Sequence, residues 1–321
     1  METEPTCAVL VLNWNGRQHL AQLLPSLQGA RTAFGRHVAL VVVDNRSSGD
    51  DVAWTRATFP DIEIVVTPRN DYLFSLNAVV AARREDVVVI LNNDMRVDAG
   101  FLAPLVAHFA DPAIFAVAAA VYEWDGSAPQ TGVRRIRFER GWLTHWFEKD
   151  PARSAYTAEA GGGCSAYHRA RFAGLGGFDR LFRPGYWEDF DLTYRAWRRG
   201  WPSVFEPRSV IYHRGGATLG RTLDDPALRR LLVRNQTLCL LKAVSGWRFA
   251  AQLLLRLPYR VCYHAALGER AVAAGMLAAV PRLPRALLGR TRLGAARLSD
   301  ADIVRTLETP MAGDATGVVA A

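Results

Sequence analysis

Continuous apolar runs that end abruptly in acidic or amide side chains dominate the first half of the chain. Residues 38–43 contain only valine, alanine and leucine and stop at Asp44, and residues 87–91 form a similar run that leads to Asp94. Runs of this length without alternation are typical of strands buried on both faces of a parallel sheet. Helix-like segments separate the runs, so the sequence predicts an α/β fold with a doubly wound, mostly parallel sheet.

The same hydrophobic patterns predict further strands and helices. Strands are expected at residues 8–13, 62–66 and 115–121, and helices at 74–83 and 99–109. Ligands of doubly wound sheets bind beyond the carboxyl ends of the strands. The acidic residues that end the two apolar runs are therefore placed where a ligand would bind.

The residue composition and the predicted secondary structure change twice in the second half of the chain. Residues 122–160 are polar, aromatic and irregular, which favours a short hairpin and a mobile loop. A helix pattern at 190–199 is closed by Gly200, and short strands at 203–206 and 210–212 lead to His213. After residue 221, helices are expected at 228–244, 247–259 and 261–279, with a basic amphipathic helix at 282–297. We therefore expect a domain at residues 1–220 and a C-terminal helical extension at 221–321.

The net charge of the chain limits the classes of partner that it is expected to bind. The formal net charge is +8, and many basic residues fall after Arg221 among leucine and alanine. This pattern suits a lipid surface better than nucleic acid, and no RNA-binding signature or zinc-finger spacing accompanies it. We expect no nucleic-acid partner and a peripheral contact with an anionic membrane. A simple helical cap on the fold explains the same helices equally well.

Three features indicate a cytoplasmic protein that lies at most on the inner face of the cell membrane. The cysteines at 7, 164, 239 and 262 form no C-x-x-C pair, which fits a reducing compartment. The N-terminal residues carry no basic segment before an apolar run, so no signal peptide is expected. No uninterrupted apolar stretch of about 18 residues is seen, and no membrane-spanning helix is expected.

Two acidic strand ends are the first candidates for chemistry. A carboxylate at the tip of a strand, such as Asp44, can accept hydrogen bonds from a base and a ribose. Asp94, after Asn92 and Asn93, offers the oxygen that a hard divalent cation prefers. Each position also suits an ordinary turn, because Asp, Asn, Ser and Gly are turn residues. The occurrence of both in one sheet favours the functional interpretation.

A third candidate is the acidic cluster Trp187-Glu188-Asp189-Phe190-Asp191. Helix capping explains carboxylates in a first turn, because the helix dipole favours them there. It explains the preceding aromatic pair less well, since aromatic rings beside carboxylates can stack a sugar face and raise a carboxylate pKa. His213 is a fourth candidate, as a metal ligand, although a lone histidine is more often structural. Neither a Rossmann glycine fingerprint nor a P-loop is present.

Taken together, these residues resemble family 2 glycosyltransferases of the GT-A fold, in their bacterial cell-envelope, rhamnosyltransferase-like branch. The likeness covers residues 7–245. It is carried, in the family's order, by VLVLNWNG at 9–16, VVVDNRSSGD at 41–50, LNND at 91–94, GGFD at 176–179 leading to WEDFDLTYR at 187–195, and HRGG at 213–216, and Arg234, Asn235 and Lys242 extend it.

The resemblance implies a role for each matched residue. Asp189 would be the general base, with Glu188 beside it. The donor nucleotide-sugar, a UDP- or dTDP-sugar, would be bound by Asn13, Asn15, Asp44, Asn77, Asn92 and Asn93. A divalent cation, Mg²⁺ or Mn²⁺, would be held by Asp94 and His213. The acceptor side would be formed by Trp187, Asp191, Gly162 and Gly163.

The implied reaction is transfer of a sugar, with inversion, to a hydroxyl of a glycan or lipid-linked acceptor. A cation would neutralise the leaving diphosphate while a carboxylate takes the acceptor proton. Two stretches depart from the family pattern: Asn92 stands where the metal motif often begins with Asp, and residues 69–77 lack the usual glycine. A non-catalytic nucleotide-sugar-binding protein on the same fold is the alternative. A nucleotidyltransferase would need a glycine-rich, basic N-terminal loop, which residues 13–17 only faintly imitate.

Overall fold

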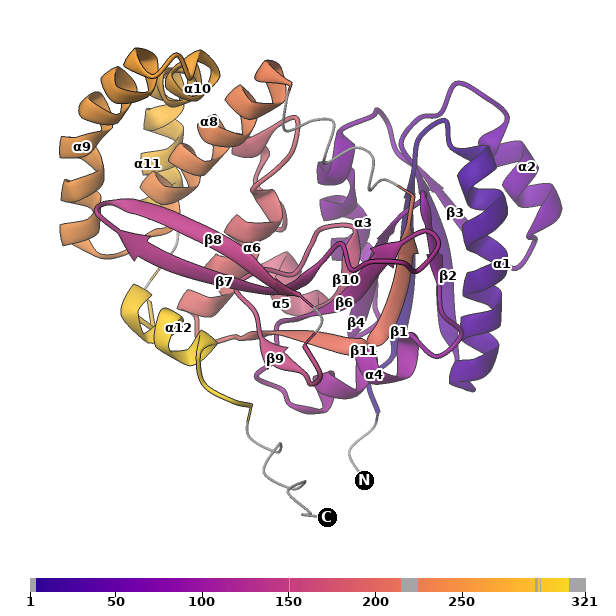
Figure 1. The fold of residues 1–321 in the computed structure, drawn as a ribbon. Helices are drawn as coiled ribbons and strands as arrows, with labels where there is room; N and C mark the ends of the chain where they lie inside the picture. The colour runs from indigo at the N-terminus through magenta and orange to yellow at the C-terminus, as the bar shows by residue number, and fades with distance from the viewer. Residues whose placement is uncertain (1–3, 150, 215–224, 292–293, 295, 312–321) are drawn as a thin grey trace.

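One mixed, curled sheet organises the part of the chain that the computed structural model describes, which is residues 4–149, 151–214, 225–291, 294 and 296–311 (Figure 1). Its strands lie in the order β3-β2-β1-β4-β10-β6-β11-β5, and β9 pairs with β11. The strands are β1 (Cys7–Asn13), β2 (Val38–Asp44), β3 (Glu63–Val66), β4 (Val87–Asn92), β5 (Met95–Val97), β6 (Ala116–Glu123), β9 (Ala155–Tyr156), β10 (Cys164–His168) and β11 (Ser203–His213). This architecture confirms the predicted α/β fold.

The parallel half of the sheet is formed by β3, β2, β1 and β4, as the apolar runs predict. Successive side chains of a strand point to opposite faces, and both faces of β1 are buried. Val9 and Val11 face one hydrophobic core with α1 (Arg17–Phe34), whereas Leu10 faces the other. In register, Asn13 lies opposite Asp44. The polar strand ends are therefore brought to one edge of the sheet.

The other half of the sheet is mixed, because β10 runs antiparallel between β4 and β6, and β5 runs antiparallel to β11. Neither β10 nor β5 is predicted from the sequence, because both are short and their pairing partners lie far away along the chain. The two short strands expected before His213 form one strand, β11, whose register with β6 shifts between Glu206 and Val210.

Helices cover both faces of the sheet. The N-terminal domain has α1, α2 (Asp51–Thr58), α3 (Leu76–Ala82), α4 (Leu102–Ala107), α5 (Arg169–Gly174) and α6 (Glu188–Arg198), with short 3₁₀ turns at Tyr72–Ser75, His108–Ala110 and Arg180–Phe182. Carboxylates fill the first turn of α6, and arginines fill its last turn. This distribution matches the helix dipole at both ends. The predicted helix at 190–199 is confirmed and begins two residues earlier.

The irregular middle segment contains a long hairpin formed by β7 (Gly132–Glu139) and β8 (Trp142–Lys149). Its turn reaches the C-terminal helices, as Figure 1 shows. At Gly141 an added Cβ would lie 2.5 Å from the backbone nitrogen of Leu253. This close approach and a φ of 74° at the same residue both require glycine at the turn. The hairpin thus links the sheet to the C-terminal helices.

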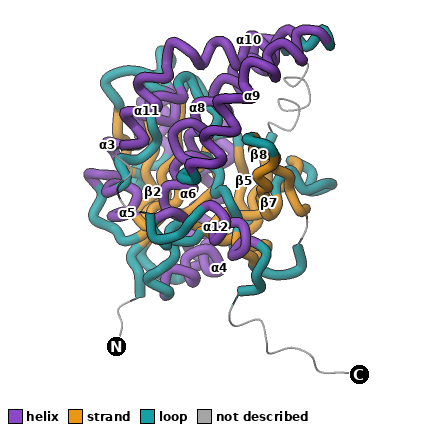
Figure 2. Tube along the Cα trace, turned by 90° about the vertical axis from the view of Figure 1, so that its left-hand side faces the viewer, coloured by secondary structure: helices purple, strands orange, loops and turns teal. Residues whose placement is uncertain are grey.

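The C-terminal region is helical, as predicted, and Figure 2 shows α8–α11 gathered at one end of the molecule. Its helices are α8 (Pro226–Ala243), α9 (Trp247–Ala266), α10 (Arg270–Ala279), α11 (Leu283–Thr291) and α12 (Asp300–Leu307), with a 3₁₀ turn, η4, at Val280–Arg282. The helix expected at 261–279 is divided, because Gly268 adopts a positive φ of 77° between α9 and α10. The expected basic helix ends at Thr291, and its residues 292, 293 and 295 lie outside the described residues, as does the domain boundary near residue 220.

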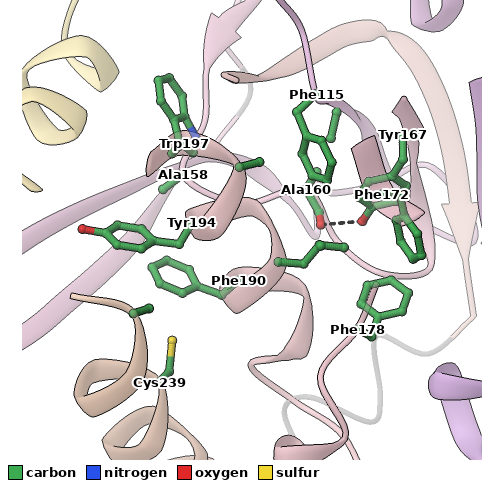
Figure 3. Close-up of a cluster of buried hydrophobic side chains, with 14 of the residues drawn as sticks. Phe115, Ala158, Ala160, Tyr167, Phe172, Phe178, Phe190, Tyr194, Trp197 and Cys239 are labelled. Atoms are coloured by element: carbon green, nitrogen blue, oxygen red, sulfur yellow. Dashed lines mark hydrogen bonds between the residues drawn. The ribbon is translucent and has the colours of Figure 1, made fainter. Parts of the chain in front are cut away.

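These helices share a hydrophobic core with the sheet domain. Figure 3 shows Phe190, Tyr194 and Trp197 of α6 packed between Cys239 of α8 and aromatic side chains such as Tyr167 of the sheet. Burial of such large rings is the main source of stability in a core of this kind. The position of α6 is therefore set by both regions.

The C-terminal region contains one segment that the expectation of no membrane-spanning helix did not single out. The helical segment at 270–291, formed by α10, η4 and α11, is long and apolar enough to cross a membrane by length and composition, with a mean hydropathy of 1.3. A third of that window is buried inside the protein. An added Cβ on Gly275 would lie 2.7 Å from the carbonyl oxygen of Arg230 in α8, so one side of this segment packs tightly on the fold.

Candidate active site

Four polar side chains interlock at the ends of β1, β2 and β4. We call Asn13, Asp44, Asp51 and Asn93 the strand-end network. The amide of Asn13 donates to Asp44 Oδ2 and to Asp51 Oδ1, each at 3.0 Å. Its oxygen accepts from Asn93 Nδ2 at 2.7 Å. A buried network with matched donors and acceptors holds its shape before any ligand binds.

Asn15 and Ser47 connect this network to the surface. The Ser47 hydroxyl donates to Asp44 Oδ2 at 2.6 Å and accepts from the backbone N–H of Asn15 at 2.8 Å. An open depression beside them is lined by Asn15, Arg17, Gln18, Ala21, Ser48, Gly49, Asp51 and Trp54. Asp44 is itself buried, and its oxygens already accept from Asn13 and Ser47. A nucleotide base could therefore reach Asp44 only through the acceptor position that remains on Oδ1, or by displacing one of those donors.

Two glycines permit the backbone to approach the strand ends. An added Cβ on Gly16 would lie 1.9 Å from Asn93 Nδ2, and one on Gly163 would lie 2.5 Å from Asn92 Cγ. The backbone N–H of Asn92 also donates to the carbonyl of Gly163 at 3.0 Å. The predicted acceptor-side loop at 161–163 is therefore packed directly against the predicted donor residues at the end of β4.

Asn77 lies apart from the strand-end network. Its Nδ2 donates to the carbonyl of Phe178 at 2.8 Å, and its Oδ1 accepts from the N–H of Phe178 at 2.9 Å. Both polar ends of the side chain are therefore used to hold the turn after α5. The structure gives Asn77 a structural contact and does not bring it to the other predicted donor residues.

Asp94 and His213 come together from β-strand ends that lie far apart in the sequence. His213 Nε2 lies 3.2 Å from Asp94 Oδ2, and His213 Nδ1 lies 2.8 Å from Gln130 Oε1. The amide of Gln130 also donates to Glu123 Oε2 at 3.0 Å, which orients its oxygen toward the imidazole. The Gln130 oxygen is therefore the partner of Nδ1, and Nε2 lies within hydrogen-bond distance of the Asp94 carboxylate.

This arrangement fits a divalent cation. His213 Nε2 and Asp94 Oδ2 face each other at 3.2 Å, and an imidazole nitrogen and a carboxylate oxygen are both ligands that bind divalent cations. Asp94 Oδ1 is buried and has no hydrogen-bond partner among the described residues. Those residues contain no cluster of three or more His, Cys, Asp or Glu side chains that could hold a metal. The two ligands would leave further coordination positions for a substrate.

The acidic cluster begins α6, and its residues point in different directions. We call Glu188 and Asp189 the carboxylate pair. Asp189 Oδ1 accepts from the N–H of Phe190 at 2.8 Å, and Oδ2 accepts from the N–H of Gly162 at 3.3 Å. Asp189 is only partly buried. Its carboxylate is thus fixed against the 161–163 loop and remains within reach of a ligand.

Burial and neighbouring charge make both carboxylates of this pair hard to ionise. Burial raises the pKa of Asp189 to about 7, and the negative charge of Glu159 adds to the rise. Burial also raises the pKa of Glu188 to about 8, with the charge of Asp189 as the second cause. Glu188 Oε2 is buried and has no hydrogen-bond partner in the part of the chain that the structure describes. A base with a pKa near neutral is well matched to proton transfer at physiological pH.

Asp191 does not occupy the expected acceptor side, because its side chain is fully buried. Both of its oxygens accept from Lys242 Nζ, at 2.7 and 2.8 Å, and Oδ2 also accepts from Arg195 at 2.8 Å. Lys242 also contacts Asp179 at 2.7 Å. Trp187, not Asp191, is the residue that precedes the first turn of α6. Asp191 therefore ties α6 to α8 and acts neither as a helix cap nor as a surface contact.

Trp187 stands over the start of α6 with a φ of 75°. Its ring packs edge-on against Phe190, and His145 of β8 packs edge-on against it, with centroids 5.1 and 5.3 Å apart. The hairpin therefore supplies one wall beside the carboxylate pair. Gly162 and Asp189 are joined by a hydrogen bond, and Trp187 lies two residues before Asp189 in the chain.

Comparison with known proteins identifies the family. A family model described as glycosyltransferase like family 2 matches residues 5–227, which is more than half of the chain. The chain belongs to glycosyltransferase family 2. Membership establishes that this protein is an enzyme that transfers a sugar.

The family 2 enzyme is similar to proteins of several organisms. It is 25% identical over 268 residues to the N-acetylglucosaminyl-diphospho-decaprenol L-rhamnosyltransferase of Mycobacterium tuberculosis, covering 74% of this chain and 85% of the relative. The mannosyltransferase PcManGT of Pyrobaculum calidifontis, solved with GDP-Man and Mn²⁺, gives a TM-score of 0.54 at 17% identity and covers 88% of each chain. GalNAc-T7, solved with UDP, GalNAc and Mn²⁺, gives 0.55 at 18% identity, covering 73% of this chain and 48% of that one. These structures establish the GT-A fold.

Sequence reasoning does not find three residues of the glycosyltransferase site, Asp51, Gln130 and Glu159, and it does not find the partner of a fourth, Lys242. Asp51 follows the matched stretch at 41–50 and reads as the start of a helix. Gln130 and Glu159 lie in the irregular middle segment, where no pattern marks them. Lys242 is matched by the resemblance, but its partner Asp191 precedes it by 51 residues, so only the folded chain shows their contact.

Proposed function

We propose that this glycosyltransferase moves a sugar, with inversion, from a nucleotide-diphosphate donor to a hydroxyl of a glycan or lipid-linked acceptor. The observation that carries the proposal is the placement of Asp189. Its carboxylate, with a raised pKa, is fixed to Gly162, and the adjoining Gly163 packs on Asn92, two residues before Asp94. A base and a cation site are thus joined by one short loop.

The donor and acceptor classes are supported by the relatives. Two similar structures were solved with UDP or GDP-Man, and the mycobacterial relative is named for rhamnose transfer to a diphospho-decaprenol carrier. We propose a UDP- or dTDP-sugar as donor and a cell-envelope intermediate as acceptor. The strand-end network would orient the nucleotide through Asn15 and the depression beside it.

Asp94 and His213 would hold a divalent cation, Mg²⁺ or Mn²⁺. Two of the similar structures contain Mn²⁺. When bound, such a cation supplies positive charge that stabilises the leaving diphosphate. Gln130 keeps the imidazole in the tautomer that exposes Nε2, which is the form that can bind a metal.

The chain's own residues account for the remaining chemistry. Asp189, once ionised, accepts the proton of the acceptor hydroxyl as its oxygen forms the new bond to the anomeric carbon. The bond to the diphosphate breaks in the same displacement, so the configuration is inverted and no covalent enzyme intermediate is needed. Trp187 offers an apolar face for a sugar ring, and Glu188, whose pKa burial raises to about 8, lies beside Asp189 mostly in its neutral form near pH 7.

The alternative that the sequence left open, a non-catalytic nucleotide-sugar-binding protein on the same fold, conflicts with membership of glycosyltransferase family 2. The buried, matched strand-end network is compatible with binding alone. Binding alone gives no reason for two adjacent carboxylates with raised pKa values, which cost stability. That pair favours the enzyme.

A donor panel tests the proposal. Binding and turnover of UDP-, dTDP- and GDP-sugars are measured with Mg²⁺, with Mn²⁺ and with a chelator. We expect turnover of one donor that requires the cation and is lost in Asp94→Ala and His213→Ala. The matched control is His37→Ala, which removes an exposed histidine elsewhere. Turnover that survives the chelator would overturn the cation site, and tight binding without any turnover would favour the non-catalytic alternative.

A further inference from the structure

Two adjacent C-terminal helical segments expose rows of apolar side chains to solvent. On α9, Leu255, Tyr259, Tyr263 and Leu267 recur every four residues, and Leu255 is 80% and Tyr259 68% exposed. Along α10, η4 and α11 a second row is formed by Leu277, Val280, Leu287 and Leu288. We call these two rows the helical face. Exposed apolar patches that recur with helical spacing mark a surface that binds something.

The charge around the helical face is strongly one-sided. Residues 247–291 contain seven arginines and a single acidic residue, Glu269. Arg256 and Arg285 are exposed on α9 and α11, beside the apolar rows. Aromatic, leucine and arginine side chains in this combination are typical of helices that lie in a bilayer interface.

We infer that the helical face docks on an anionic bilayer, with α9 and the 270–291 segment lying along its surface. The apolar rows would enter the boundary between headgroups and acyl chains, and the arginines would contact the anionic headgroups. The protein would thereby sit peripherally on the inner face of the cell membrane.

A second copy of this chain is a poorer occupant of the helical face. A two-fold contact would press the same arginine-rich surface against itself, and like charges that meet across an interface oppose association. Glu269 is already paired with Arg229 and His264 and offers little compensation. An anionic lipid surface supplies the opposite charge everywhere along the face.

The packing of the 270–291 segment favours lying on the membrane over crossing it. Gly275 approaches the backbone of α8 so closely that an added Cβ would lie 2.7 Å from a carbonyl oxygen. Val272 and Met276 on the same helix are buried in the protein. To span a bilayer, the segment would have to leave these contacts and expose its partner surface on α8.

The hairpin connects the helical face to the carboxylate pair. Trp142, at the start of β8, packs under Arg260 of α9, with the guanidinium 5.1 Å from the ring centroid. Three residues further along β8, His145 packs on Trp187. Three residues of strand span roughly 10 Å. If the proposed function holds, docking would therefore bring the carboxylate pair close to the bilayer surface, where a lipid-linked acceptor presents its headgroup.

Vesicle flotation tests the inference with the full chain. Vesicles of phosphatidylcholine, with and without phosphatidylglycerol, are mixed with the protein in the absence of any donor. We expect binding only to the anionic vesicles, weakened by salt because exposed charges are screened. Absence of binding to the anionic vesicles would overturn the inference.

Two variants locate the bound surface. Leu255→Asp with Tyr259→Asp, at highly exposed positions, should weaken binding about tenfold or more, and Arg256→Glu with Arg285→Glu should do the same. The control pair, Arg56→Glu with Arg84→Glu on the sheet domain, makes the same change in net charge and should bind more strongly than the Arg256 and Arg285 pair. Equal loss in both charge pairs would reduce the effect to net charge and overturn the assigned face.

Two further readouts separate the possible failures. Light scattering of the free protein should show a monomer, and a dimer that dissociates in the Leu255 and Tyr259 variant would assign the face to self-association. Vesicle binding is measured without a nucleotide-sugar and without sugar transfer, so the membrane inference can be confirmed even if the proposed reaction is wrong. Conversely, loss of vesicle binding with normal transfer to a soluble acceptor would leave the reaction intact.

Discussion

The strand-end network and the carboxylate pair are built on opposite principles. In the network, Asn13 satisfies Asp44, Asp51 and Asn93, and the group is matched without a ligand. In the pair, Glu188 has a buried oxygen without a partner, and Asp189 ionises only near neutral pH. The strand-end network has its hydrogen bonds satisfied, whereas ionising the carboxylate pair costs free energy.

The difference reflects two tasks of one enzyme. A binding surface gains affinity when it is ordered before the ligand arrives, because less freedom is lost on binding. A base must instead be kept reactive, and burial beside like charge achieves this by raising its pKa. The predictions below test whether the two regions can be disturbed separately, starting with the largest effect.

The largest effect is expected where α6 is tied to α8. Lys242 is 3% exposed and holds the buried carboxylate of Asp191 together with Asp179. Lys242→Met removes the ammonium group that the two carboxylates share and leaves Asp191 with Arg195 alone, which should lower the free energy of unfolding by about 3–5 kcal/mol. Urea denaturation measures it. Arg17→Met removes the surface pair with Asp50 and should cost less than about 1 kcal/mol, and equal costs would contradict the assignment.

Breaking the strand-end network should affect donor binding. Asn13→Leu removes the donors to Asp44 and Asp51 and should lower the free energy of unfolding by about 1–3 kcal/mol. The affinity for the donor, measured by calorimetry, should fall about tenfold. Asn77→Ala is the matched control, because that amide holds only the backbone of Phe178. A larger loss of donor affinity in Asn77→Ala would restore the donor role that the sequence predicts for it.

The acid limb of the pH–rate profile should report Asp189. The base must be ionised, so transfer should fall as the pH drops below about 7. Glu159→Gln removes a negative charge that raises the pKa of Asp189, so the acid limb should move to lower pH. Glu148→Gln, in the same hairpin region but paired with Arg135, should leave the limb in place. An unchanged limb in Glu159→Gln would show that burial alone sets this pKa.

The smallest effect is on thermal stability. The pKa of Asp189 in the folded protein lies above its ordinary value. Protonated Asp189 therefore contributes to the stability of the fold at low pH, and this contribution is lost as the pH rises toward 7. Asn cannot ionise and escapes this loss. The melting temperature of Asp189→Asn relative to wild type should therefore be higher at pH 8 than at pH 4, by about 2 °C or more. No such difference would argue against a raised pKa.

The parallel half of the fold and its strand ends were predictable from the sequence. Apolar runs set the strands, and parallel pairing then places Asn13 beside Asp44 without further information. The short strand β5, the end of α9 and the burial of Asp191 were not predictable. The end of α9 depends on the positive φ of Gly268. The strand β5 and the burial of Asp191 depend on partners distant in sequence, as when Gln130 orients His213 across 83 residues. Local patterns identify the residues of this site but not which neighbours complete it.

The most direct test of the account compares binding and transfer in Asp189→Asn. Calorimetry measures the affinity for the nucleotide-sugar with the cation present, and a transfer assay measures the rate with the acceptor. The account predicts donor affinity within about twofold of wild type, because the strand-end network is untouched, and a rate lower by about 10²–10⁴-fold. Transfer at a near-normal rate would contradict the assignment of Asp189 as the base.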